Sequence, residues 1–300
     1  MKLLTTVLTS CNLKKLKRAL VSIGQLEDVV IICNTLDEEY YKKLCEDSYC
    51  QNFNIVRTQS NGTVAKGKQS VIDYFLNTEY DWITMLDGDD FLGPDGISIV
   101  HNTLQNSNAD VLFTSETIVL PNLQIFHSTK QFHCINWQVL SPKFMALANN
   151  DKVRKKMKTA FKFYSRVKKT LGQKDYTCFR LLCCNKQSAK TIQYPSIICH
   201  EEFNVNFKLL EQAIIGNLNL LLLVNDSCYI YDRTIPLNVG NTDSALATLY
   251  DIDIAELEKN TYNGITLDTE KIINNYKIPE IITDSVMVPE LEQYIKERIL

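Results

Sequence analysis

The chain has few helix-breaking residues and no long apolar run. Its 300 residues include only 10 glycines and 7 prolines and are 45% hydrophobic, which indicates a well-ordered globular protein with room for one sizeable domain and an appendage. The apolar run at residues 218–224 is much shorter than the ~20 residues that a membrane-spanning helix needs. The stretch at residues 3–8 is interrupted by threonines and followed by basic residues, so it predicts a core strand rather than a secretion signal. We therefore expect a soluble protein.

The chain also lacks cysteine pairs with Cys-x-x-Cys spacing and an excess of positive charge. No Cys-x-x-Cys pair occurs among the 10 cysteines, and several of them, such as Cys33 and Cys199, lie within apolar runs. A free thiol in such a run behaves as a small buried hydrophobic group, so we predict reduced, structural cysteines and a cytoplasmic location. The net charge is -3, which argues against nucleic acid as a partner.

The first 120 residues show apolar runs that alternate between strand-like and helical spacing. Short strands that alternate with helices predict an α/β fold, in which a mainly parallel sheet is built through right-handed crossovers and binds ligands at the carboxyl ends of its strands. The expected strands are residues 3–8, 28–33, 54–58, 81–86 and 110–114, and the expected helices are residues 13–23, 38–45, 63–75 and 96–105.

The second half of the chain is less regular. Residues 152–174 carry 10 basic side chains and no acidic one, interleaved with aromatic residues. Further along, the pattern predicts a strand at residues 179–184, an amphipathic helix at 203–215 and a strand or strand pair at 218–231. After residue 244 the pattern is mostly that of amphipathic helices, and Pro289 is well placed to open the last one.

An acidic turn follows the apolar strand at residues 82–86. Asp87, Asp89 and Asp90 surround Gly88, which lets the backbone turn tightly and lets a ligand approach closely. So much negative charge beside a buried strand predicts a bound cation. Mg²⁺ and Mn²⁺ prefer oxygen ligands and share them with substrate phosphates, so we predict a divalent metal that carries a phosphate-rich ligand.

Two other interpretations of the acidic turn fit less well. A calcium-binding EF-hand loop would need an oxygen ligand where Phe91 stands and a glycine where Leu92 stands. A phosphatase of the haloacid dehalogenase type carries its Asp-x-Asp motif on the first strand, whereas three expected strands precede Asp87 here.

Several stretches in the same order resemble the family 2 glycosyltransferases, which have the GT-A fold. The resemblance extends over about residues 3–240 and is strongest over residues 3–95. The stretches are residues 7–12 and 29–35 at two strand ends, 61–69 at a helix start, the metal motif at 85–90 with Pro94 after it, 199–203 at an acidic helix start, and the aromatic strand at 229–231.

The resemblance implies a Rossmann-like GT-A domain with a helical C-terminal extension, and a sugar transferred from a nucleoside diphosphate donor, most simply a UDP-hexose, to a hydroxyl acceptor with inversion. Mn²⁺ or Mg²⁺ would be held by Asp87 and Asp89, and Glu202, or its neighbour Glu201, would be the general base. The donor would be bound by Thr9, Asn12, Asn34, Lys66, Lys68, Asp87 and Gly88.

The chain departs from the family pattern at three of these positions. Asn34 replaces an aspartate, so its contact with a nucleobase would carry no charge. Lys68 stands where the family has arginine and loses the bidentate fork. Glu202 replaces an aspartate and is longer by one methylene. No histidine follows His200, so a late histidine ligand for the metal is missing.

We therefore expect a glycosyltransferase domain over residues 1–243, with a nucleotide-binding half at 1–120 and an acceptor half at 121–243, and a helical extension at 244–300.

The basic helical insert at 150–175 predicts contact with an anionic acceptor, such as a saccharide or glycoconjugate, or peripheral contact with an anionic membrane surface. The C-terminal helices predict core capping or a homodimer contact. Two alternatives stay open: a sugar nucleotidyltransferase, although residues 12–15 lack its glycine-rich loop, and a non-catalytic sugar-nucleotide-binding protein.

Overall fold

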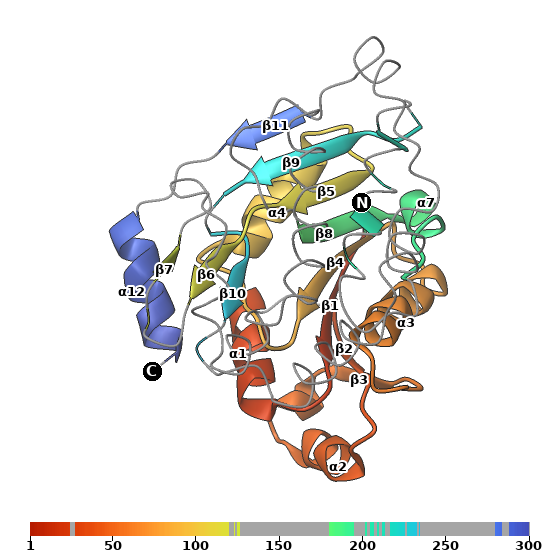
Figure 1. Ribbon diagram of the computed structural model, residues 1–300, viewed down its shortest axis with the longest axis vertical. Coiled ribbons are helices and arrows are strands. Elements are labelled where there is room, and N and C mark those ends of the chain that lie inside the picture. The colour runs from red at the N-terminus through yellow and green to blue at the C-terminus, as the bar shows by residue number, and fades with distance from the viewer. Residues whose placement is uncertain are drawn as a thin grey trace, which may run out of the picture.

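The structure is a computed structural model of the chain (Figure 1). It describes residues 1–24, 28–119, 123, 125–126, 180–194, 202, 205–206, 209, 212–213, 217–225, 227–232, 234, 280–283 and 288–299. The basic insert, Glu201 and most of the predicted helical extension therefore lie outside the described residues.

An eight-stranded sheet forms the centre of the fold, in the order β11-β9-β5-β8-β4-β1-β2-β3. All neighbouring strands run parallel except β8, which is antiparallel to both β4 and β5. The predicted α/β class with a mainly parallel sheet is confirmed. The strands are β1 (Leu3–Thr9), β2 (Val29–Cys33), β3 (Asn54–Arg57), β4 (Trp82–Asp87), β5 (Val111–Thr114), β8 (Arg180–Asn185), β9 (Leu220–Val224) and β11 (Glu280–Thr283).

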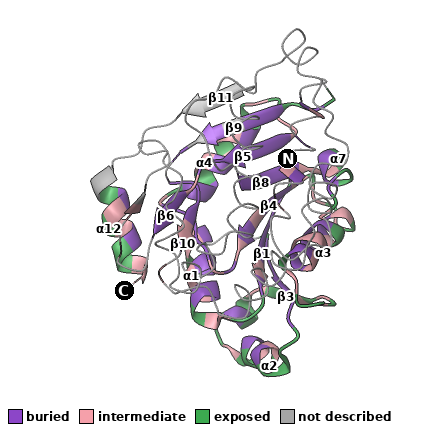
Figure 2. Cartoon of the chain, in the orientation of Figure 1, coloured by how far each residue is buried: buried purple, intermediate pink, exposed green. Residues whose placement is uncertain are grey.

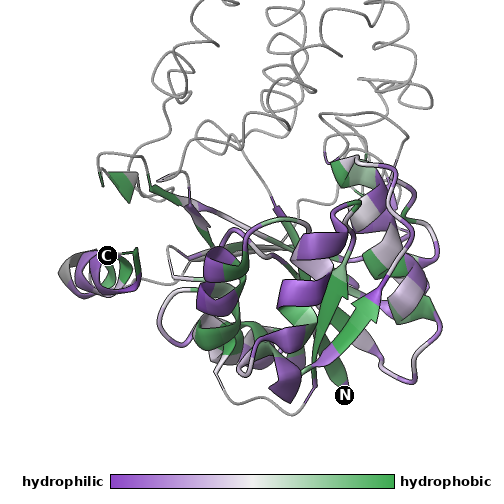
Figure 3. Cartoon of the chain, turned by 90° about the horizontal axis from the view of Figure 1, so that it is seen from below, coloured by the Kyte–Doolittle hydropathy of each residue, from purple (hydrophilic) through white to green (hydrophobic). Residues whose placement is uncertain are grey.

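Helices cover both faces of this sheet, whose strands are largely buried (Figure 2). The buried apolar residues form two hydrophobic clusters, one on each face. The first cluster joins the sheet to α1 (Leu13–Ile23), α2 (Glu38–Glu46) and α4 (Gly96–Gln105). The second joins it to α3 (Val64–Leu76), to the short α7 (Lys186–Ala189) and to the buried residues Val205, Leu209 and Ala213. Figure 3 shows largely hydrophobic strands among helices in which hydrophilic and hydrophobic residues are mixed.

The local sequence explains where these helices begin. The side chains of Asn12, Asp37 and Thr63 each accept a hydrogen bond from a backbone N–H in the first turn of α1, α2 and α3, respectively. The buried residues of α1 recur at helical spacing, which places one apolar face on the sheet. Up to residue 114 the predicted strands and helices agree with the structure to within about two residues at each end, the usual disagreement in assigning element ends.

A second, three-stranded sheet, in the order β10-β6-β7, was not predicted as such. It consists of β6 (Thr117–Val119), β7 (Ile125–Phe126) and β10 (Ile230–Asp232). The expected strand or strand pair at 218–231 is therefore two strands, of which β9 joins the large sheet and β10 the small one. In the region expected to be mostly helical, β11 is a strand that extends the large sheet through parallel pairing with β9.

The last helix, α12 (Val288–Ile299), packs on the small sheet. It is the C-terminal helix that the sequence predicted to begin near Pro289. Its Leu291 and Ile295 are fully buried against Phe91, Val119 and Ile230. The hydroxyl of Tyr294 donates a 3.1 Å hydrogen bond to the backbone oxygen of Leu92, next to the acidic turn. Over the residues that the structure describes, no helix has the length and apolar character needed to cross a bilayer.

We expect Ile295→Ala to lower the free energy of unfolding by about 2–5 kcal/mol, because it leaves a cavity between α12 and the small sheet. Gln293→Ala, on the exposed side of the same helix, should change it by less than about 0.5 kcal/mol. Urea denaturation measures both. Equal effects would contradict the packing of α12 on this sheet.

Candidate functional site

The carboxyl ends of β1, β2 and β4 meet at one edge of the large sheet. Leu8 pairs with Asp87 across β1 and β4, and Thr9 pairs with Cys33 across β1 and β2. Thr9, Asn34 and the acidic turn, which are far apart in the sequence, are therefore neighbours at the edge where parallel sheets bind ligands.

Gly88 is required by the close approach of two strand ends. Its N–H donates a 2.7 Å hydrogen bond to the backbone oxygen of Leu8. A Cβ atom at position 88 would lie 2.7 Å from that same oxygen, which is too close for any side chain. The glycine of the acidic turn thus lets the turn lie against β1.

The three aspartates of the turn have different surroundings. Asp90 is buried, and its carboxylate accepts hydrogen bonds of 2.8 Å from the Tyr229 hydroxyl and 3.0 Å from the Asp232 N–H, so it anchors the turn to β10. Asp87 is ion-paired with Arg180 at 2.6 Å. The carboxylate of Asp89 has no hydrogen-bond or ion-pair partner among the described residues, and it is the one open oxygen ligand of the turn.

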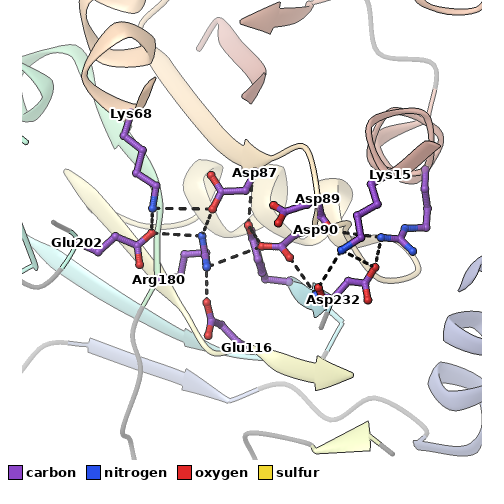
Figure 4. A network of polar contacts seen from close by, with 11 residues as sticks. Lys15, Lys68, Asp87, Asp89, Asp90, Glu116, Arg180, Glu202 and Asp232 are labelled. Atoms are coloured by element: carbon purple, nitrogen blue, oxygen red, sulfur yellow. Dashed lines mark hydrogen bonds and ion pairs between the residues drawn. The ribbon is translucent and has the colours of Figure 1, made fainter. Parts of the chain in front are cut away.

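Arg180, the first residue of β8, lies at the centre of the site (Figure 4). Its Nη1 atom lies 2.6 Å from the Asp87 carboxylate and 3.4 Å from that of Glu202, and its Nε donates a 2.5 Å hydrogen bond to Glu116. Its guanidinium also lies 4.3 Å from the centre of the Tyr229 ring. Burial would lower the pKa of Arg180, but Tyr229 and the carboxylates raise it well above the usual value, so the side chain stays charged.

Lys68, on α3, links the same two carboxylates from the other side. Its Nζ atom forms a close ion pair with Glu202 and lies 3.9 Å from Asp87. Glu202 thus reaches the acidic turn from a position far along the chain, and Arg180 and Lys68 each bridge it to Asp87. The structure brings together the predicted metal ligand Asp87 and the predicted base Glu202.

A second group of charges lies beside Asp89. Asp232 is buried and is ion-paired with Arg18 and, at 3.5 Å, with Lys15, both on α1. Burial would raise the pKa of Asp232, but Arg18, Thr234 and Lys15 lower it below the usual value. Arg18 also donates a 3.2 Å hydrogen bond to the backbone oxygen of Asp89, so this group holds the turn in place.

The charges of this site leave room for a divalent cation. Six carboxylates surround four cationic side chains in its described part, which leaves a formal charge of -2. No three His, Cys, Asp or Glu residues in the described ranges are arranged to hold a metal by themselves. Mg²⁺ commonly uses one or two carboxylates, substrate phosphates and water, so Asp89 with Asp87 fits such an ion, provided that a ligand supplies further oxygens.

Three of the predicted donor-binding residues are engaged within the protein. The hydroxyl of Thr9 is hydrogen-bonded to that of Tyr40. The side-chain amide of Asn34 donates hydrogen bonds to Thr58 at 2.6 Å and to neighbouring oxygen atoms. Asn12 caps α1 through a 3.0 Å hydrogen bond from the Lys15 N–H. These contacts order the strand ends that surround the site.

Lys66 differs from these residues, because its side chain is half-buried and has no hydrogen-bond or ion-pair partner within the described part of the chain. Its backbone belongs to the first turn of α3, where its N–H donates to the hydroxyl of Thr63. Lys66 thus remains open to a ligand at the start of this helix.

The sequence did not point to Arg180, although a signal was present. It is a single cation directly before the apolar run 181–184, which forms a buried antiparallel strand. The same reasoning that singled out a charged turn after the strand at residues 82–86 applies to a charge before this strand. Tyr229 was singled out only as part of the aromatic strand at 229–231, and Glu116 and Asp232 carry no comparable local signal.

Comparison with solved structures finds similarity to S. aureus TarS. TarS residues 1–349 match with 14% identity and a TM-score of 0.48, over 92% of this chain and 79% of that one. A longer TarS chain matches with 15% identity and a TM-score of 0.46, over 89% of this chain and 46% of that one. TarS 1–349 in complex with UDP matches with 13% identity and a TM-score of 0.46, over 88% and 70%. No protein-family model and no curated protein sequence matches this chain.

We expect Arg180→Met to lower the free energy of unfolding by about 3–5 kcal/mol, because it leaves the buried Asp90 and the partly buried Asp87 and Glu116 without their shared cation. Arg57→Met is the matched control: Arg57 forms an exposed ion pair with Glu38, and its loss should have a much smaller effect. Chemical denaturation measures both variants. Similar losses would contradict the central place of Arg180.

Proposed function

We propose that this chain is a metal-dependent inverting glycosyltransferase. It transfers a sugar from a nucleoside diphosphate sugar, most simply a UDP-hexose, to a hydroxyl acceptor. The observation that carries the proposal is the approach of Glu202 to the acidic turn, where Asp87 and Glu202 contact the same nitrogen of Arg180 and Asp89 is left open.

The acidic turn would hold the metal. Asp89, with Asp87 beside it, would hold Mn²⁺ or Mg²⁺, which when bound neutralises the negative charge of the departing nucleoside diphosphate. Lys68 and Lys66, on α3, add positive charge at the same end of the sheet. Thr9, Asn12, Asn34 and Gly88 shape the neighbouring strand ends where the nucleoside would lie.

Glu202 would act on the acceptor. As a general base it takes the proton from the acceptor hydroxyl while the oxygen attacks the anomeric carbon from the face opposite the leaving group. In-line displacement of this kind inverts the anomeric configuration. The base and the metal ligands must then lie on opposite sides of the sugar ring, which requires acidic groups from separate parts of the chain. Glu201, its neighbour, is the alternative base.

The second candidate is a non-catalytic sugar-nucleotide-binding protein. The pairing of Glu202 with both Lys68 and Arg180 favours it, because a carboxylate that is held by cations is a weak base. Nucleotide-sugar binding without transfer or hydrolysis would support this candidate.

Release of pyrophosphate from a nucleoside triphosphate and a sugar phosphate would instead support a nucleotidyltransferase. Contact of the basic insert with an anionic acceptor or membrane surface, and a homodimer, stay predictions.

We expect Asp89→Ala to abolish turnover and to weaken Mn²⁺-dependent UDP binding on the order of 100-fold, because the open carboxylate of the turn is lost. Calorimetric titration with UDP and Mn²⁺, together with UDP release from a panel of UDP-hexoses, measures both effects. Asp73→Ala, on the exposed surface of α3, is the control and should behave as wild type. Unchanged metal-dependent binding in Asp89→Ala would refute the metal assignment.

Glu202→Gln should slow transfer by about 10²–10⁴-fold without weakening UDP binding, because it removes the proton acceptor and keeps the shape of the side chain. Transfer is measured as UDP release from UDP-hexose with a panel of saccharide acceptors. The control is Glu79→Gln, an exposed glutamate that pairs with Lys2 at 3.9 Å. A transfer rate in Glu202→Gln close to that of the control would refute the base assignment.

A further inference from the structure

Lys68 is shared between two carboxylates that have different roles in the proposed function. Its Nζ atom is paired closely with Glu202, the base, and lies 3.9 Å from Asp87, at the metal site. The Lys68 side chain is 11% exposed, whereas those of Asp87 and Glu202 are 24% and 36% exposed. The ion pair with Glu202 therefore forms the more exposed side of the charged cluster.

Arg180 holds the same carboxylates but is fixed in place. Its guanidinium contacts Asp87 and Glu116 at 2.6 and 2.5 Å and lies over the ring of Tyr229 at 4.3 Å. A planar guanidinium with this many directional contacts cannot move without breaking several of them. Lysine differs, because it carries a compact charge on a flexible four-carbon stem and can change partners by rotation.

A nucleoside diphosphate bound at the acidic turn would bring a new anion close to Lys68. The diphosphate would lie beside Asp87 and Asp89, and Asp87 already lies 3.9 Å from the ammonium group. Phosphate oxygens form strong charge-assisted hydrogen bonds with ammonium groups. A partly exposed ion pair contributes little net stability, so the exchange of Glu202 for a phosphate costs little.

We propose that Lys68 is a positioning residue that changes partners: it holds Glu202 in the nucleotide-free protein and moves to the diphosphate when the donor binds. This inference rests on the proposed function. The move releases Glu202 from the Lys68 ammonium group at the moment when the donor is in place. Glu202 thus becomes the stronger base only in the donor complex, and the nucleotide-free site keeps it engaged.

The exchange has a thermodynamic consequence that can be measured. Glu202 and the diphosphate compete for one ammonium group, so Glu202 lowers the affinity for nucleotide. Removing the charge of Glu202 should therefore tighten nucleotide binding, and the gain should depend on Lys68. A carboxylate that acts only through long-range repulsion would give a gain that does not depend on Lys68.

The test is a double-mutant cycle on UDP affinity, measured by calorimetry in the presence of Mn²⁺, with Glu202→Gln, Lys68→Met and the double variant. We expect Glu202→Gln to tighten UDP binding by about five- to tenfold, which lies within the range expected for the net contribution of one typical hydrogen bond. In the Lys68→Met background, Glu202→Gln should leave the affinity unchanged. An equal gain in both backgrounds, or no gain in either, would overturn the exchange.

Glu116→Gln is the matched control, because Glu116 pairs with Arg180 at 2.5 Å but not with Lys68. Its effect should be the same in both backgrounds. If Lys68→Met binds UDP too weakly to measure, the variants Glu202→Gln and Glu116→Gln decide. A gain in UDP affinity confined to Glu202→Gln supports the exchange, and equal gains in both variants overturn it.

A wild-type protein that binds no UDP with Mn²⁺ would overturn the proposed function itself, whereas binding without this coupling overturns only the inference.

Discussion

The buried guanidinium of Arg180 is the interaction on which the arrangement of the site depends. Desolvating a charge is costly unless oppositely charged partners surround it, and Arg180 has carboxylate neighbours from β4, from the segment before β6 and from position 202. Each of these segments belongs to a different part of the chain. Arg180 thus brings them together at one edge of the large sheet, and together they offset the cost of its burial.

This arrangement separates the three aspartates of the acidic turn. Asp90 is used to hold the turn against β10, and Asp87 is used to balance Arg180. Asp89 alone keeps an open carboxylate, while Arg18 fixes its backbone. The charge that a ligand or metal would meet is therefore much smaller than three adjacent aspartates suggest, because the protein neutralises most of it with its own side chains.

The sequence predicted the elements of the first 114 residues closely, because local features specify them. Apolar residues recur at helical spacing in α1, continuous apolar runs mark the buried strands, and Asn12, Asp37 and Thr63 cap helices. The small sheet could not be predicted in the same way. Its strands are only two or three residues long, and such short segments have no periodicity that a sequence can show. In addition, β6 pairs with β10 across more than 100 residues.

The sequence by itself determined that an acidic turn ends a buried strand, because adjacent residues carry this signal. Only the tertiary structure decided which charges meet. Arg180 reaches Asp87 across 93 positions, and Lys68 reaches Glu202 across 134. Ion pairs of this kind depend on strand order and on burial, and neither can be read from neighbouring residues.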